Sequence, residues 1–140
     1  MNQNFIFIPV LLHMLLVLFL YIRLALEKSK AVKVGNVDLK KTALNTKAWP
    51  ENVVKVSNSI GNQFETPMLF YTLSVIFNLT SSVDVAVMLL VSIYTLSRYI
   101  HAYVHVTTNY VPVRLKLFLV GILILLCMVV WMLFKLILSI

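Results

Sequence analysis

The sequence predicts an all-α membrane protein, a bundle of four transmembrane helices. Its composition is the first observation behind this prediction: hydrophobic residues make up 61% of the 140 residues and charged residues 12%, and the mean hydropathy is +0.94. A soluble domain is nearer one half apolar and one quarter charged. The second observation is that the apolar residues gather into long runs, each close to the length of a helix that spans a bilayer.

The runs predict four spans, at residues 5–26, 57–79, 83–106 and 115–138. The first run lacks the basic start and the small-residue cleavage site of a signal peptide, so we expect it to be retained. The connector at residues 80–82 is so short that the third span must turn straight back after the second. Pro112 ends the connector before the fourth span. We therefore expect residues 1–140 to form one four-helix domain.

The placement of lysine and arginine predicts the orientation. The polar stretch at residues 27–55 carries seven lysines against three acidic residues, and Arg114 and Lys116 open the fourth span. Because cytoplasmic loops carry an excess of Lys and Arg, we expect these basic connectors in the cytoplasm and both termini outside. Lys135 is the exception, and its long side chain can reach the interface. The lysines indicate attraction to anionic lipid, and we expect no nucleic-acid partner.

Glu65 is the most unusual residue of the second run. A carboxylate inside an apolar segment is costly and is usually paired or functional. Glu65 lies about eight residues, or about 12 Å, from the cytoplasmic start of its span, and Arg98 lies equally far from the cytoplasmic end of the third. We therefore expect Glu65 to face the bundle interior and to form an ion pair with Arg98. Such a pair could belong to a binding pocket or could only fix the register of two helices.

Other polar side chains reach the same level of the membrane. They come from all four spans and, with the expected pair, comprise Arg23, Asn62, Glu65, Arg98, His101, His105 and Arg114. The arrangement predicts a cationic pocket that opens at headgroup level between apolar walls. The alternatives are packing histidines and arginines that only anchor helix ends. We expect no metal site, and the single Cys127 excludes an intramolecular disulfide.

Two of these motifs resemble those of the MAPEG family, the membrane-associated proteins in eicosanoid and glutathione metabolism. One motif is Asn62-Gln-Phe-Glu65-Thr-Pro67, and the other is Arg98-Tyr-Ile-His101, which runs on to Pro112-Val-Arg114. The chain looks most like the small bacterial members. The resemblance implies a homotrimer in the bacterial inner membrane. It also implies glutathione between neighbouring subunits on the cytoplasmic side, and a lipophilic substrate that arrives from the bilayer.

The resemblance assigns roles to individual residues. Glutathione-binding positions match Asn62, Glu65, Arg98 and His105, with Arg23 as a looser match, and the position near the sulfur matches Arg114. A guanidinium there favours the thiolate over the thiol, so we expect Arg114 to be catalytic. The chain departs from enzymatic relatives where they carry two arginines, at Asn58 and Gly61, and two tyrosines, at His105 and Phe118.

Two functions follow as hypotheses. The first is a glutathione-dependent transferase or peroxidase that acts on lipophilic electrophiles. The alternative is a non-catalytic membrane protein that uses the same pocket to bind a lipid or a partner protein. A channel or transporter is disfavoured, because we expect the spans to lack the broken helices and internal repeats that transporters show.

Overall fold

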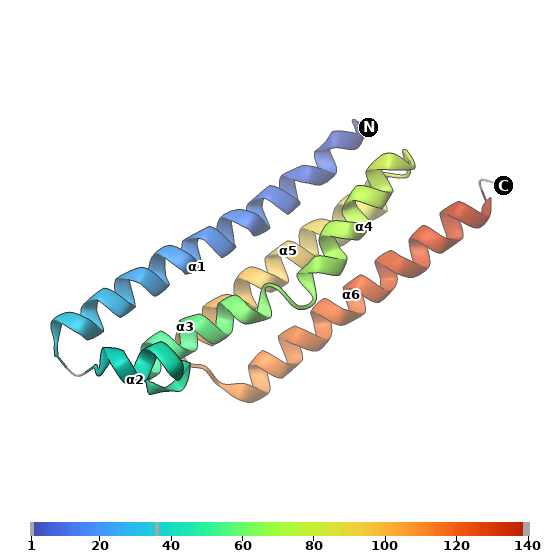
Figure 1. Ribbon diagram of the computed structural model, residues 1–140. Coiled ribbons are helices and arrows are strands. Elements are labelled where there is room, and N and C mark those ends of the chain that lie inside the picture. The colour runs from blue at the N-terminus through green and yellow to red at the C-terminus, as the bar shows by residue number, and fades with distance from the viewer. Residues whose placement is uncertain (1, 36, 139–140) are drawn as a thin grey trace.

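Helices account for all the regular structure of residues 2–35 and 37–138, which are the residues that the computed structural model describes (Figure 1). In chain order they are η1 (Gln3–Ile6), α1 (Phe7–Lys33), α2 (Leu39–Leu44), η2 (Thr46–Ala48), α3 (Glu51–Asn62), α4 (Pro67–Leu79), α5 (Val85–Val106) and α6 (Val111–Leu138). Within this part of the chain there is no β-strand, so the all-α prediction is confirmed. The two chain ends lie at one end of the bundle, here called the terminal end, and α2 lies at the other, the α2 end.

Three of the predicted spans correspond to long helices. Among the described residues, three stretches are long and apolar enough to cross a membrane: Gln3–Lys33, Val85–Val106 and Val111–Leu138. The first continues well beyond the predicted end at residue 26. The last begins before the predicted residue 115, because a proline at the second helical position, Pro112, costs no intrahelical hydrogen bond in the first turn.

The prediction of one continuous helix over residues 57–79 is wrong. The segment contains α3 and α4, of 12 and 13 residues, which follow one another along the bundle with a break between them (Figure 1). Pro67 explains the break, since it lacks the N–H that would bond to the carbonyl of Gln63, and its ring would clash with that carbonyl. Each piece is only about 18–20 Å long, shorter than the hydrocarbon layer of about 30 Å.

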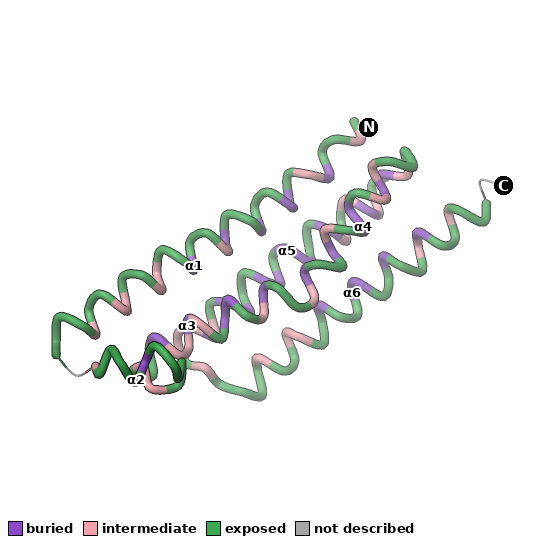
Figure 2. Tube along the Cα trace, viewed as in Figure 1, coloured by how far each residue is buried: buried purple, intermediate pink, exposed green. Residues whose placement is uncertain are grey.

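Two clusters of buried apolar residues hold the helices together. The larger cluster lies toward the terminal end and joins α1, α4, α5 and α6 through residues such as Val10, Phe70, Val91 and Met128. The smaller one lies toward the α2 end and joins only α1, α3 and α5, through Leu16, Leu20, Val56, Ile60 and Ala102. The buried positions of α6 lie within residues 121–132, and its first ten residues, toward the α2 end, have none (Figure 2). This first stretch of α6 is therefore loosely packed against the other helices.

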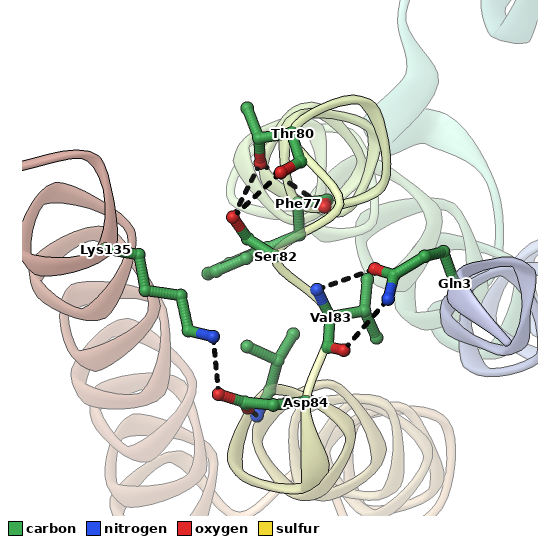
Figure 3. A network of polar contacts seen from close by, with 8 residues as sticks. Gln3, Phe77, Thr80, Ser82, Val83, Asp84 and Lys135 are labelled. Atoms are coloured by element: carbon green, nitrogen blue, oxygen red, sulfur yellow. Dashed lines mark hydrogen bonds and ion pairs between the residues drawn. The ribbon is translucent and has the colours of Figure 1, made fainter. Parts of the chain in front are cut away.

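Polar contacts fasten the terminal end (Figure 3). The Gln3 side chain bonds to both backbone groups of Val83, accepting from the N–H at 2.8 Å and donating to the carbonyl at 3.3 Å. Lys135 Nζ lies 2.7 Å from Asp84 Oδ2, so this lysine is held in an ion pair. Burial by itself would raise the pKa of Asp84, but the bonds from Lys135 and the Val87 N–H outweigh it and hold that pKa below 3.8. These contacts tie η1 and α6 to the turn between α4 and α5.

Candidate functional site

The break between α3 and α4 forms the centre of the candidate site. Asn62 is the last residue of α3, and Gln63 follows it into the break. The Gln63 side chain is only 1% exposed, and its Nε2 donates to the Ser59 carbonyl at 3.2 Å. The break thus turns one amide into the protein interior, while its neighbours Asn62 and Glu65 remain accessible.

Arg98 is buried behind the break and is bonded to oxygen atoms from it. Its side chain is 1% exposed. Nε and Nη2 donate to Gln63 Oε1 at 3.2 and 3.1 Å, and Nη2 also donates to the Asn62 carbonyl at 2.7 Å. Nη1 is buried without a hydrogen-bond partner among the described residues. Amide and carbonyl oxygens thus stabilise this buried guanidinium.

His13 extends this buried network into α1. Gln63 Oε1 lies 3.2 Å from His13 Nε2, and His13 Nδ1 lies 2.6 Å from the Tyr71 hydroxyl. Because Arg98 carries only donors, the Gln63 oxygen must face it, and His13 Nε2 must donate to the same oxygen. A neutral His13 then accepts the Tyr71 O–H at Nδ1. One amide oxygen therefore joins α1, α5 and the break.

The predicted ion pair between Glu65 and Arg98 is wrong. No ion pair of Glu65 occurs within the described part of the chain, and the Glu65 side chain is exposed and lines a cleft. Glu65 follows Gln63 by two residues, inside the break. We predicted that Glu65 and Arg98 lie at the same depth along the bundle. The break instead directs the Gln63 side chain toward Arg98 and leaves the Glu65 side chain accessible. The expectation that Glu65 faces the packed interior is wrong for the same reason.

The cleft lies between the break, α5 and the loosely packed first stretch of α6. Its volume is about 220 Å³, and it is lined by Asn62, Glu65, His101, Val111, Arg114, Leu115 and Phe118. Polar groups come from the break and α5, whereas α6 contributes mainly apolar side chains and Arg114. The cleft is therefore a small amphipathic site, with charges of both signs beside an apolar wall.

Two nitrogen-bearing side chains have unused hydrogen-bonding capacity at the cleft. Arg114 Nη1 donates to Asn109 Oδ1 at 2.7 Å, whereas its Nε is buried without a partner within residues 2–35 and 37–138. Asn62 Nδ2 donates to the Asn58 carbonyl at 3.0 Å and to His105 Nε2 at 3.1 Å. The oxygen of the Asn62 amide is thus turned away from these contacts and is available as an acceptor. A ligand with both donors and acceptors fits such a site.

The structure brings together some of the predicted site residues and separates others. Asn62, Glu65 and Arg114 line the cleft. His105 does not line it but is hydrogen-bonded to Asn62. Arg98 lies behind the break, out of direct reach. Arg23 lines a different cavity, between α1 and α5.

Sequence reasoning missed one contributor. Gln63 was overlooked because an uncharged amide raises no charge-pairing question, although its place beside Asn62 was a signal. His101 was predicted as part of the polar layer, with a packing role as the alternative, and it lines the cleft.

A sequence model of the MAPEG family matches residues 5–134 of the chain. The chain belongs to the MAPEG family. This confirms the resemblance seen in the motifs around Glu65 and Arg98. Comparison with curated proteins and comparison with solved structures give no match. Together with the three long apolar helices, membership makes this MAPEG protein a multi-pass integral membrane protein.

Proposed function

We propose that this MAPEG protein binds glutathione in the cleft and acts as a transferase or peroxidase on lipophilic electrophiles. The observation that carries the proposal is that Arg114 lines the same cleft as Asn62 and Glu65, with its Nε buried and unpartnered among the described residues. An unsatisfied buried donor is costly unless a ligand or water completes it. A thiolate or carboxylate would do so.

Each cleft residue suits a different part of glutathione. Glutathione would supply a thiol, which attacks an electrophile or a peroxide in its ionised form. Arg114 favours that ionised form through its positive charge. Glu65 attracts an ammonium group, and the free Asn62 oxygen accepts from an N–H group. Phe118 and Leu115 form an apolar wall suited to a lipophilic second substrate.

Arg98 and His105 act in this proposal as positioning residues. Arg98 holds the carbonyl of Asn62 and the side chain of Gln63, and His105 accepts from the Asn62 amide. Both therefore set the orientation of Asn62 without reaching the cleft themselves. Arg23 lines another cavity, so it is not part of the cleft that one chain forms.

We also propose that α3 and α4 together cross the membrane as one span, the second in chain order, beside the spans of α1, α5 and α6. The chain ends lie at the same end of the bundle, as an even number of crossings requires (Figure 1). The basic connectors lie at the α2 end, so the positive-inside rule favours a cytoplasmic α2 end in a bacterial inner membrane. Labelling of single cysteines introduced at either end, from outside intact cells, would decide the orientation.

The proposed assembly is a homotrimer. The resemblance supports it, and so does the cleft, which is open at its side in one chain and could be closed by a neighbouring subunit. Native mass spectrometry in mild detergent tests this, and a monomer would contradict it.

The decisive experiment measures conjugation of a lipophilic electrophile with glutathione by the purified protein. We expect Arg114→Leu to lose about 100-fold in turnover, as expected when a charge-assisted hydrogen bond is lost from a partly buried site (about 3 kcal/mol). Arg114→Lys should keep part of the rate, since an ammonium retains the charge but not the planar donors. Lys116→Leu is the matched control, because it removes a cation from an exposed position two residues away.

The outcomes separate the two functions. Full turnover in Arg114→Leu would remove Arg114 from the mechanism. Glutathione binding without turnover over a broad electrophile panel would favour the non-catalytic alternative, and absence of binding would overturn the proposal. Helicity and assembly state must match the wild type in every variant, because Arg114 also holds Asn109 in the connector before α6.

A further inference from the structure

A long apolar groove follows the contact between α1 and α5. It consists of three cavities of about 370, 640 and 170 Å³. Tyr99 lines all three, so they adjoin one another around its side chain. Buried residues such as Leu16 and Ala102 form the floor, and exposed ones such as Phe19, at 60% exposure, form the rim. The groove shares no lining residue with the cleft.

The groove has the length of a lipid chain. On α1 it extends from Pro9 to Arg23, and on the antiparallel α5 from Val106 back to Ser92. Fourteen helical residues correspond to about 21 Å. One leaflet of the hydrocarbon layer is about 15 Å deep. A chain that starts at the α2 end would therefore reach past the middle of the bilayer.

The two ends of the groove differ in chemistry. The end toward the terminal end has no charged side chain, and its hydroxyl groups belong to Ser92, Thr95 and Tyr99. Thr95 donates to the Pro9 carbonyl and Tyr99 to the Leu12 carbonyl. The end toward the α2 end carries Arg23 and Tyr103. Arg23 is half-buried, and among the described residues it forms no ion pair and no hydrogen bond through its side chain. A cation without a counter-ion among the described residues thus lies at the α2 end of the apolar groove.

The chain itself offers no anion for Arg23. It has five acidic residues and a net charge of +7. Glu27, Glu51 and Asp84 are paired with lysines, Asp38 caps α2, and Glu65 lines the cleft on the other side of α5. A second copy of so basic a chain is a poor source of negative charge. The bilayer is a better one, since anionic phospholipid brings a phosphate to headgroup level together with acyl chains.

We propose that the groove is a binding site for one anionic phospholipid. Its phosphate is bound by the guanidinium of Arg23 and the hydroxyl of Tyr103, and one acyl chain lies along α1 and α5 past Tyr99. Arginine suits this role because its planar guanidinium can donate two parallel bonds to a phosphate. The proposal is independent of glutathione binding, since groove and cleft are separate.

Native mass spectrometry of the protein extracted from defined vesicles tests the proposal. The vesicles contain phosphatidylcholine with a minority of phosphatidylglycerol. We expect the wild type to retain one phosphatidylglycerol per protomer, in preference to phosphatidylcholine. Arg23→Gln should retain about tenfold less, as expected for loss of a charge-assisted contact. Ser92→Phe, at an exposed position that lines the far part of the groove, should lower retention of the lipid by obstructing its chain.

Matched controls make the result specific. Lys116→Gln removes a cation on α6 near the α2 end, and Ile93→Phe adds the same ring beside the groove without lining it. Both should retain phosphatidylglycerol as the wild type does. Unchanged retention in Arg23→Gln, equal retention of both lipids by the wild type, or equal effects of Ser92→Phe and Ile93→Phe would overturn the proposal. So would disulfide cross-linking between Ser92→Cys copies in a Cys127→Ser background, because a second chain would then cover the groove.

Discussion

Replacing Gln63 by leucine should destabilise the protein far more than replacing the neighbouring charged residue Glu65 by glutamine. Gln63 Oε1 accepts from Arg98 Nε, Arg98 Nη2 and His13 Nε2, all inside the protein. Leucine removes this acceptor and leaves two buried donors unpaired, since Arg98 Nη2 keeps the Asn62 carbonyl. Each buried donor left unsatisfied costs about 1–3 kcal/mol, and more when it is charged. We therefore expect a loss of about 3–5 kcal/mol for Gln63→Leu.

Thermal unfolding in detergent, followed by circular dichroism, measures the effect. A loss of this size should lower Tm by about 10 °C or more. Glu65→Gln is the matched control, since the Glu65 side chain is exposed and outside the network, and its Tm should stay close to that of the wild type. Gln63→Glu should keep most of the stability, because a carboxylate accepts the same bonds and pairs with the guanidinium. Equal Tm values for Gln63→Leu and Glu65→Gln would refute the reasoning.

Two further predictions concern the cleft and the terminal end. A Cβ added at Gly61, the residue before Asn62, would meet no atom within 4 Å. Gly61→Arg should therefore tighten glutathione binding about tenfold, through a charge-assisted bond from the new guanidinium to the glutathione. An unchanged Kd by titration calorimetry would contradict this. The pKa of Asp84 is held below 3.8, so its pair with Lys135 stabilises the fold above that pH, and this contribution is lost as the pH falls through the lowered pKa. Asp84→Asn should therefore cost up to about 1 kcal/mol at neutral pH and nothing in strong acid, because the pair is partly exposed and asparagine still caps α5. A stability difference that persists unchanged in acid would contradict this.

The helices were predictable because length and hydropathy act along one chain. Long apolar runs located α1, α5 and α6 to within a few residues at most ends. The break before Pro67 was visible as a proline but was read as part of a continuous span, since the apolar residues continue on both sides. A single missing N–H outweighed the hydropathy pattern there.

Side-chain pairing was not predictable, because it depends on direction around a helix as well as on depth. Glu65 and Arg98 were expected at one level of the membrane. The sequence does not show that the break turns Gln63 toward Arg98 and leaves Glu65 exposed. Lys135 shows the same limit. Its place at a helix end suggested an interfacial lysine, whereas its partner Asp84 comes from a turn far away in the sequence. Long-range polar contacts require the fold before they can be identified.

The break between α3 and α4 also has a consequence for how the protein enters a membrane during synthesis. Neither α3 nor α4 is long enough to cross a bilayer by itself. The segment that follows α1 therefore cannot be inserted as an independent span. The short turn from Leu79 to Val85 joins α4 directly to the long α5. If α3 and α4 cross the membrane as proposed, insertion machinery would have to admit α3, α4 and α5 as one unit. The Asn62 carbonyl at the break would gain its hydrogen bond only once Arg98 is in place on α5.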